Sequence, residues 1–247
     1  NVLNAEEQAP ELPLISNFCP AVQRLIQIRF PLLVDNLSRL RPPAQVTAIF
    51  ARSELSAVSP SLGIFYFTPC AAKIAQFNTE GSEENRLFDG IINIDTAYNL
   101  VSTYLAKQDQ VQEGSLTFAM CTKHALLWSL VKGQIPSHEG RTLAVDEMHN
   151  VIEFLEILEE EAQTSLQFLE LDACAEGCVG GILTVRNRFL ASERLKYYSQ
   201  QLPDVLDEVL TKRIRDQRKA FQNDLRLPPF EATMTMGLDT DRSRALY

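Results

Sequence analysis

Short apolar runs alternate with amphipathic stretches along most of the chain. The runs at residues 63–67 and 166–171 are continuous, which is typical of strands buried on both faces of a parallel sheet. Residues 96–107 and 145–163 instead carry apolar side chains three and four positions apart, the spacing of an amphipathic helix. This alternation predicts an α/β protein with mostly parallel sheets flanked by helices.

Local signals predict further elements. Pro20 follows Cys19 as the first residue of a helix would, because proline is well tolerated at that position. We expect strands at 12–16, 87–94 and 116–119, and helices at 21–30 and 125–131. Residues 45–52 are expected to form a helix or a strand, and 78–86 and 133–142 to form loops. Charged helices are expected over 187–223, the last starting near Pro203. A break between two lobes is expected near 108–115 or 133–142.

Composition restricts the classes of function. The 247 residues suffice for one large domain or two lobes, and a hydrophobic content of 45% is ordinary for a globular protein. The net charge of −9 argues against nucleic-acid binding, since no basic surplus is available for phosphates. No apolar run approaches the roughly 20 residues of a membrane span. We therefore expect a cytoplasmic protein with no membrane span and no nucleic-acid partner.

Four of the five cysteines lie in three short motifs. Cys19 precedes a predicted helix, Cys70 follows the first apolar run, and Cys174 and Cys178 follow the second run in a glycine-rich loop. Four thiolates on separate turns suit a [4Fe–4S] cluster, although they suit zinc too. Buried structural cysteines are the third interpretation.

The predicted elements suggest how these cysteines come together. In α/β sheets functional groups collect at the carboxyl ends of strands, so two strand ends would direct thiols to one place between two lobes. A helix N-terminus next to Cys19 favours negative charge. Gly177, Gly180 and Gly181 are expected to let backbone N–H groups point at the sulfurs, which would help to set the redox potential of a cluster.

The three motifs, taken together, resemble those of the iron-only ([FeFe]) hydrogenase family, in the C-terminal domain of its large subunit. The segment LPLISNFCP at residues 12–20, with FPLL at 30–33, resembles the first motif of the family. The segment FTPCAAK at 67–73 resembles its second motif, and ELDACAEGCVGG at 170–181 resembles its third. The similarity extends from about residue 12 to residue 195 in the order of the family.

The resemblance implies a two-lobed α/β domain with an iron–sulfur cluster between the lobes. It implies that Cys19, Cys70, Cys174 and Cys178 ligate a [4Fe–4S] cluster, and that Lys73 corresponds to the lysine that contacts the two-iron subsite of hydrogenases. In true hydrogenases the last cysteine also bridges to that subsite. We expect residues 1–195 to form this cluster-binding domain and residues 196–247 a helical C-terminal extension and tail.

The chain departs from the family pattern around the two-iron subsite. Phe18 stands where the proton-relaying cysteine would be, Thr68 and Asp172 replace methionines, and Glu176 replaces a glycine. We therefore expect a relative without hydrogenase activity, an electron-transfer module or subunit of a larger redox complex of anaerobic metabolism. Its partners would be other redox subunits or flanking cluster domains.

Two other functions remain open. One is a redox- or hydrogen-sensing protein that retains a modified two-iron subsite, and the other is a scaffold with a purely structural cluster. Lys73 could donate to a cluster sulfur, bind a small anion or pair with Asp172. Cys121 lies outside the motifs and is expected to be a buried free thiol, and Trp128 a core residue. The three histidines show no metal-ligand spacing: His124, His138 and His149.

Overall fold

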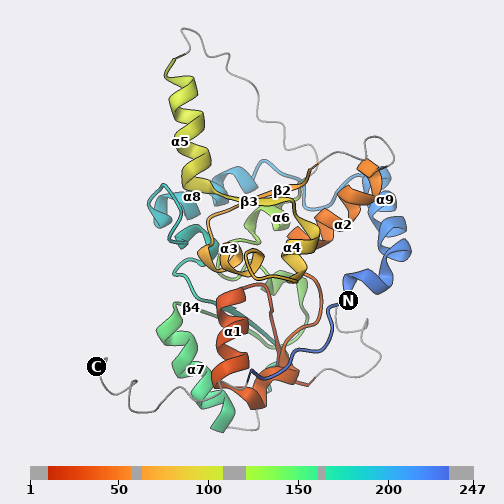
Figure 1. The fold of residues 1–247 in the computed structure, drawn as a ribbon. Coiled ribbons are helices and arrows are strands. Elements are labelled where there is room, and N and C mark those ends of the chain that lie inside the picture. Colours follow the sequence, from red (N-terminus) through yellow and green to blue (C-terminus); the bar gives the residue numbers. More distant parts are fainter. Residues whose placement is uncertain (1–10, 57–62, 108–120, 161–164, 234–247) are drawn as a thin grey trace.

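The computed structural model describes residues 11–56, 63–107, 121–160 and 165–233, which form two parallel sheets flanked by helices (Figure 1). The first sheet has the strand order β1 (Leu14–Ile15), β5 (Phe168–Asp172), β4 (Thr142–Asp146). The second pairs β2 (Phe65–Thr68) with β3 (Gly90–Asn93). The predicted α/β class with parallel sheets is confirmed.

Helices connect the strands and cover the first sheet. The α-helices are α1 (Pro20–Arg29), α2 (Pro43–Ser56), α3 (Ala71–Phe77), α4 (Glu83–Leu87), α5 (Ile94–Leu105), α6 (Lys123–Leu127), α7 (Met148–Glu160), α8 (Arg188–Ser199) and α9 (Glu208–Ala220). Short 3₁₀ turns are η2 (Pro31–Asn36), η3 (Ile135–Ser137), η4 (Gly177–Gly180) and η5 (Gln222–Leu225). Among the described helices, none combines the length and apolar character needed to cross a membrane.

The central strand β5 organises the first sheet. It pairs in parallel with β1, placing Leu14 opposite Phe168, and with β4, placing Thr142 opposite the same residue. All five residues of β5 are buried. Because successive side chains of a strand point to opposite faces, both faces of this sheet must be covered. The prediction of a doubly buried strand is therefore confirmed here.

The main core lies where α1 and α7 pack against the first sheet. The apolar positions of α1 and α7 recur at helical spacing, so Val22 and Ile26 share one face, as do Val151 and Leu155, and all four side chains are fully buried. Arg29 of α1 also pairs with Glu156 of α7 at the surface. Burial of these apolar faces fixes the helix that begins directly after Cys19.

The second sheet is less buried than the sequence predicts. The apolar run at 63–67 predicts a strand buried on both faces, but Phe65 and Phe67 of β2 are 56% and 54% exposed. Tyr66, on the opposite face, stacks on Phe88 with ring centroids 5.3 Å apart. Within the described residues this two-stranded sheet is thus covered on one face only. A continuous apolar run does not distinguish one covered face from two, because that depends on what packs above the sheet.

The structure also corrects the helix predicted at residues 145–163. Residues 145–163 predict a single helix, whereas Thr142–Asp146 forms β4 and the helix starts at Met148. Glu147 makes the turn with φ of 67°. Residues Thr142–Asp146 form backbone hydrogen bonds with β5. This tertiary contact overrides the helical spacing of the local sequence.

The helices α4 and α9 do not begin where the sequence predicts. The predicted loop at 78–86 contains the start of α4, whose N-cap Ser82 accepts a hydrogen bond from Asn85 N at 3.1 Å. The last long helix begins at Glu208 rather than near Pro203, because Asp207 caps it by accepting from Leu210 N. The strand expected at 116–119 and the possible lobe break at 108–115 lie outside the described residues.

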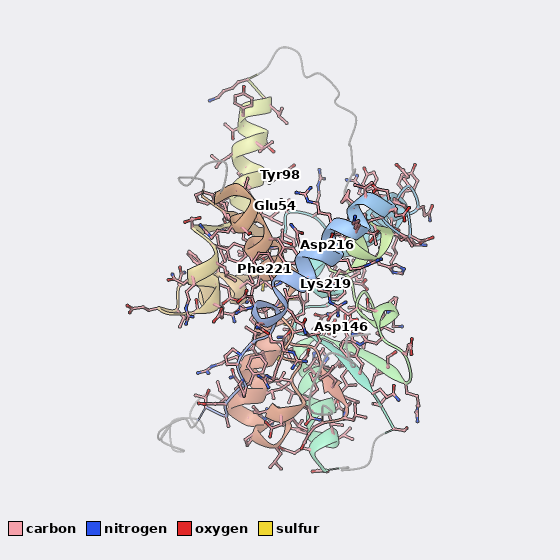
Figure 2. The ribbon with its side chains drawn as sticks, turned by 90° about the vertical axis from the view of Figure 1, so that its right-hand side faces the viewer. Glu54, Tyr98, Asp146, Asp216, Lys219 and Phe221 are labelled. Carbon is pink, nitrogen blue, oxygen red and sulfur yellow. The ribbon has the colours of Figure 1, made fainter. Side chains whose placement is uncertain are left out.

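The C-terminal elements pack back onto the first half of the chain. Arg213 of α9 pairs with Glu54 of α2 at 2.6 Å, and the ring centroid of Phe221 lies 5.5 Å from that of Phe50. Figure 2 labels Glu54 and Phe221 on this side of the molecule. Leu227 N then donates to Arg39 O. A division into 1–195 and 196–247 stays a prediction, and α8 runs across that boundary.

The packing of α1 leads to a matched prediction. Ile26→Ala should lower the free energy of unfolding by about 2–5 kcal/mol, because the side chain is fully buried and its removal leaves a cavity. Ile28→Ala in the same helix should cost far less, since Ile28 is 43% exposed. Urea denaturation of both variants checks this, and equal losses would contradict the packing described.

Candidate functional site

The four predicted cysteines line one narrow cavity between the two sheets. Cys19, Cys70, Cys174 and Cys178 all border it, although they come from three distant parts of the chain. Lys73 also lines this cavity, so the four predicted cluster ligands and the predicted lysine are all present. The remaining lining residues are Phe18, Pro20, Asp172, Ala173, Gly177 and Gly181.

Helix starts position two of the cysteines. Cys19 is the N-cap residue of α1, and Cys70 is the N-cap residue of α3. The backbone N–H groups of Val22 and Ala173 face the Cys19 thiol. Free N–H groups and the positive end of the helix dipole favour negative charge at such a position. The sequence predicts the helix start at Cys19, whereas it gives no such indication at Cys70.

The loop that carries the other two cysteines is fixed by backbone contacts. Cys178 N donates to Ser129 O at 2.8 Å, Gly177 N to Cys174 O at 3.2 Å, and Gly181 N to Cys178 O at 3.1 Å. The N–H groups of Gly177 and Gly181 therefore donate to carbonyl oxygens rather than pointing at sulfurs, which corrects the expectation for these two of the three glycines. The glycines instead allow close backbone packing.

Two of these glycines lie against the backbone of other segments. Gly177 has φ of +72°, and a Cβ there would lie 2.7 Å from Ser129 O. At Gly181 a Cβ would lie 2.7 Å from Pro69 O, one residue before Cys70. A larger residue at either position would therefore push the cysteine loop away from Pro69 or Ser129.

Burial strongly affects the thiols of the cavity. Desolvation raises the pKa of Cys174 to about 11 and that of Cys178 to about 12, with further contributions from neighbouring thiols. Desolvation also raises the pKa of Cys19, against the lowering effect of the N–H groups of Val22 and Ala173. Thiols of this kind stay protonated at neutral pH unless a positive group is bound beside them.

Lys73 lies next to these thiols without an ion-pair partner in the described part of the chain. Its Nζ sits 3.9 Å from the centroid of the Phe18 ring, a cation–π contact. Desolvation lowers the pKa of Lys73, but Tyr66 and the thiols of Cys178, Cys70 and Cys19 raise it further, so the net shift is upward. Among the ion pairs of the described residues, the pairing with Asp172 that the sequence allows is not formed.

Strand β5 carries two buried carboxyl groups, Asp172, which lines the cavity, and Glu170, which does not. Desolvation, the nearby Glu170 and Asp146 raise the pKa of Asp172 to about 7, against the lowering effect of Lys73. Glu170 is fully buried, and its Oε2 accepts a hydrogen bond from the backbone N–H of Gln134 at 2.9 Å. Desolvation raises the pKa of Glu170 despite this bond.

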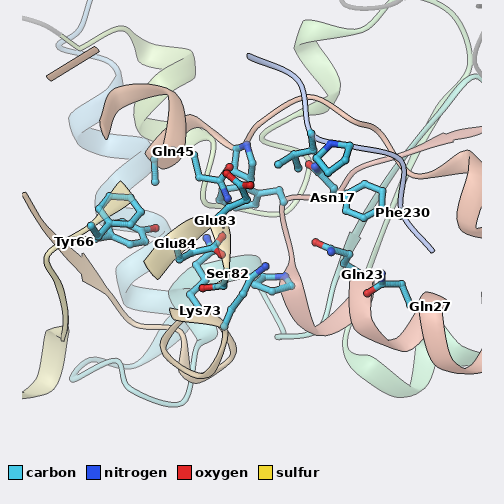
Figure 3. A pocket seen from close by; sticks show the side chains of 18 of the residues that line it. Asn17, Gln23, Gln27, Gln45, Tyr66, Lys73, Ser82, Glu83, Glu84 and Phe230 are labelled. Atoms are coloured by element: carbon cyan, nitrogen blue, oxygen red, sulfur yellow. Dashed lines mark hydrogen bonds between the residues drawn. The ribbon is translucent and has the colours of Figure 1, made fainter. Parts of the chain in front are cut away.

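Two larger cavities share Phe18 and Lys73 with the cysteine cavity. One, of about 480 Å³, is lined by α1 and the C-terminal segment on one side (Figure 3). In Figure 3 Gln23, Gln27 and Phe230 stand across from Tyr66 and Lys73. The other cavity, of about 360 Å³ and mostly apolar, borders Cys178.

Several residues that the sequence analysis set aside lie elsewhere. Cys121 is half-buried rather than buried, does not line the cysteine cavity, and its Sγ donates to Thr122 O at 3.4 Å. His138 stacks on Phe168 at 3.5 Å, and burial lowers its pKa. Trp128 packs its ring edge-on against Phe18 at 6.2 Å, so it supports the wall of the cavity.

The sequence analysis does not identify two residues that affect the charges at the cavity. Tyr66 is the largest influence that raises the pKa of Lys73, and Asp146 accepts a hydrogen bond from Glu176 N at 2.8 Å while it repels Asp172. The only signal for Asp146 is its position at a strand end, and the spacing around it predicts a helix instead. Tyr66 lies within an aromatic run that looks uniformly structural.

The glycine loop gives a second matched prediction. Gly177→Ala should destabilise the fold and disorder the Cys174–Cys178 loop, since the new Cβ adds a backbone clash to the strain of a positive φ. Gly81→Ala is the control: its φ is +76°, but no atom lies within 4 Å of the added Cβ, so it should cost only about 1 kcal/mol. Thermal unfolding of the two variants separates the clash from the strain, and similar losses would contradict the contact with Ser129.

Comparison with solved structures finds the same fold in hydrogenases. An [FeFe]-hydrogenase from a study of oxygen inactivation of the H cluster is 14% identical, with a TM-score of 0.63 over 94% of this chain and 78% of that chain. A variant of a Chlamydomonas reinhardtii [FeFe]-hydrogenase is also 14% identical, with a TM-score of 0.61 over 91% and 77%. A hydrogenase from a study of H-cluster assembly is 15% identical, with a TM-score of 0.62 over 91% and 77%. At these identities the likeness is one of fold.

A sequence comparison identifies the family. No curated protein matches this chain. The profile of the family described as "Iron only hydrogenase large subunit, C-terminal domain" matches residues 2–127, just over half of the 247 residues. The matched region contains Cys19, Cys70 and Lys73, while Cys174 and Cys178 lie beyond it. The chain therefore belongs to the family defined by the C-terminal domain of the iron-only hydrogenase large subunit.

Proposed function

We propose that Cys19, Cys70, Cys174 and Cys178 bind a [4Fe–4S] cluster and that the protein transfers single electrons within a larger redox assembly. The observation that carries this proposal is the meeting of four thiols from three motifs at one cavity. Such a cluster supplies a one-electron couple when bound. Its solved relatives include hydrogenases that carry an H cluster, which agrees with an iron–sulfur group at this place.

The residues at the cavity suit such a group. Four thiols supply the full set of cysteine ligands that a [4Fe–4S] cluster takes. Cys19 and Cys70 occupy the N-cap positions of α1 and α3, where the positive ends of the helix dipoles favour thiolates. The raised pKa values of Cys174 and Cys178 mean that these thiols need a bound positive group to lose their protons.

Zinc is the other metal that four thiols could bind. A structural zinc site gathers four sulfurs, each about 2.3 Å from one ion. Within the described ranges, no three His, Cys, Asp or Glu side chains are arranged to hold a single metal ion. A cubane presents four irons at separate corners and takes one thiolate at each, so the metal content of the protein decides between the two.

The side chains next to the cavity argue against hydrogen turnover. Phe18 lines the cavity where a proton-relaying thiol would stand, and a phenyl ring carries no exchangeable proton. Thr68 is buried, with its Oγ1 accepting from Cys70 N at 3.3 Å, so it is occupied in supporting the helix start. These substitutions leave electron transfer as the function that the residues support best.

Electron transfer requires partners. We propose that other redox subunits or flanking cluster domains deliver and remove electrons, and that the protein works in the cytoplasm. The domain division proposed for the chain, with a cluster-binding part at 1–195 and an extension at 196–247, would leave α9 as part of the surface available to such partners.

Metal analysis tests the proposal. Anaerobically reconstituted protein should contain about four irons per chain and show the EPR signal of a reducible cubane. Cys174→Ala or Cys178→Ala should lose iron and lower stability, since cluster binding is coupled to folding. Cys121→Ala is the control and should keep its iron. Zinc alone in the wild-type protein, or iron loss only in the Cys121 variant, would refute the ligand set.

A second candidate function is redox or hydrogen sensing with a modified two-iron subsite. The observation in its favour is the mostly apolar cavity of about 360 Å³ that borders Cys178, Lys73 and Thr68. This cavity lies beside the cysteine that bridges to the subsite in hydrogenases.

Infrared spectroscopy after maturation decides between the two functions. We expect no bands from CO or CN⁻ ligands and no hydrogen turnover, because Phe18 offers no proton path at the cavity. Bands from CO or CN⁻ ligands would instead support the sensing function and contradict a protein that only transfers electrons. The iron content of the same sample serves as the control for cluster assembly.

A further inference from the structure

Lys73 is the one cationic side chain among the described residues that line the cysteine cavity. It is only 8% exposed, and within the described part of the chain it forms no ion pair and donates no hydrogen bond. A buried lysine almost always has a negative partner, because removing an ammonium group from water is costly. Its isolation therefore points to a negative group in the cavity that it faces.

The ring of Phe18 determines where the ammonium group lies. Nζ is 3.9 Å from the ring centroid, and the ring itself is supported edge-on by Trp128 at 6.2 Å and 86°. A ring face attracts a cation through its quadrupole but carries no full charge and accepts no proton. Phe18 thus holds the ammonium in place without neutralising it, which an acidic side chain at this position would do.

Three of the four thiols lie within the electrostatic reach of this charge. The thiols of Cys178, Cys70 and Cys19 each interact favourably with Lys73 when they are ionised. Asp172 also borders the cavity, so the fixed charges of the protein around the thiols are one cation and one carboxyl group. A cation next to a redox centre stabilises its more negative state, and the effect is large where water is excluded.

We propose that Lys73 is the counter-charge that stabilises the reduced cluster and that Phe18 is the residue that positions it. This inference rests on the proposed function, because it requires a [4Fe–4S] cluster on the four cysteines. A one-electron donor such as a reduced viologen adds one electron to the cluster core, which passes from its 2+ to its 1+ state. The four thiolates stay bound, and no proton moves and no bond breaks, so the negative charge that Lys73 faces grows by one unit.

Redox titration of reconstituted full-length protein tests this role. Mediators poise the potential, and EPR measures the fraction of reduced cluster. Lys73→Met removes the charge and keeps most of the side-chain volume. At a fixed potential it should lower the ratio of reduced to oxidised cluster at least about tenfold, which corresponds to about 59 mV for a one-electron couple. Lys73→Arg keeps the charge and should stay close to the wild type.

Two further variants make the result specific. Lys212→Met removes a cation from the exposed surface of α9 and should leave the midpoint potential unchanged. Phe18→Leu keeps Lys73 but removes the ring, so the midpoint potential should fall in the same direction by a smaller amount. A purely structural role for Lys73 would change iron content or stability while leaving the midpoint potential of the bound cluster as it was.

The outcomes separate this inference from the function on which it rests. An unchanged midpoint potential in Lys73→Met, at wild-type iron content, overturns the inference and leaves the proposed function intact. If Lys73→Met takes up no iron, Phe18→Leu decides: an unchanged midpoint potential there overturns the inference, and a lowered one supports it. Absence of a cluster from the wild-type protein overturns both.

Discussion

The parallel pairing of β1 with β5 is the constraint on which the cysteine cavity depends. Ile15 lies opposite Leu169, so both strands end at the same edge of the sheet. Cys19 follows Ile15 by four residues and Cys174 follows Leu169 by five, which brings two distant thiols to that edge. Both residues of β1 and all five residues of β5 are buried, so the core encloses this pairing on both faces.

The second sheet completes the site from the other lobe. The end of β2 leads through Pro69 to Cys70 and Lys73, and the cysteine loop is anchored to this side by backbone contacts. Leu183 N donates to Pro69 O at 3.3 Å, and Cys178 N donates to Ser129 O. The loop that carries Cys174 and Cys178 therefore joins the two lobes at the cavity. The positions of the four thiols follow from strand register on one side and from glycine packing on the other.

This arrangement concentrates buried ionisable groups where a core would ordinarily be apolar. Glu170, Asp172 and Lys73 are each at most 8% exposed, and desolvation opposes the charged form of all three. Such groups weaken a fold unless each finds a partner. Glu170 finds backbone N–H groups, whereas Lys73 finds only the ring of Phe18 within the described part of the chain. The unfavourable burial of the Lys73 ammonium is what the proposed negatively charged cluster would offset.

Much of this protein was determined by local sequence. The continuous run that became β5, the helical spacing of α1 and α7, and the cysteine motifs after strand ends all act over a few residues, so they predict the α/β class and the residues of the cavity. Tertiary structure alone decided the remainder. It made a strand of Thr142–Asp146 by pairing it with β5, left Phe65 and Phe67 exposed, and placed Lys73 over Phe18. These features depend on which surfaces meet across the fold, and no spacing along the chain records that.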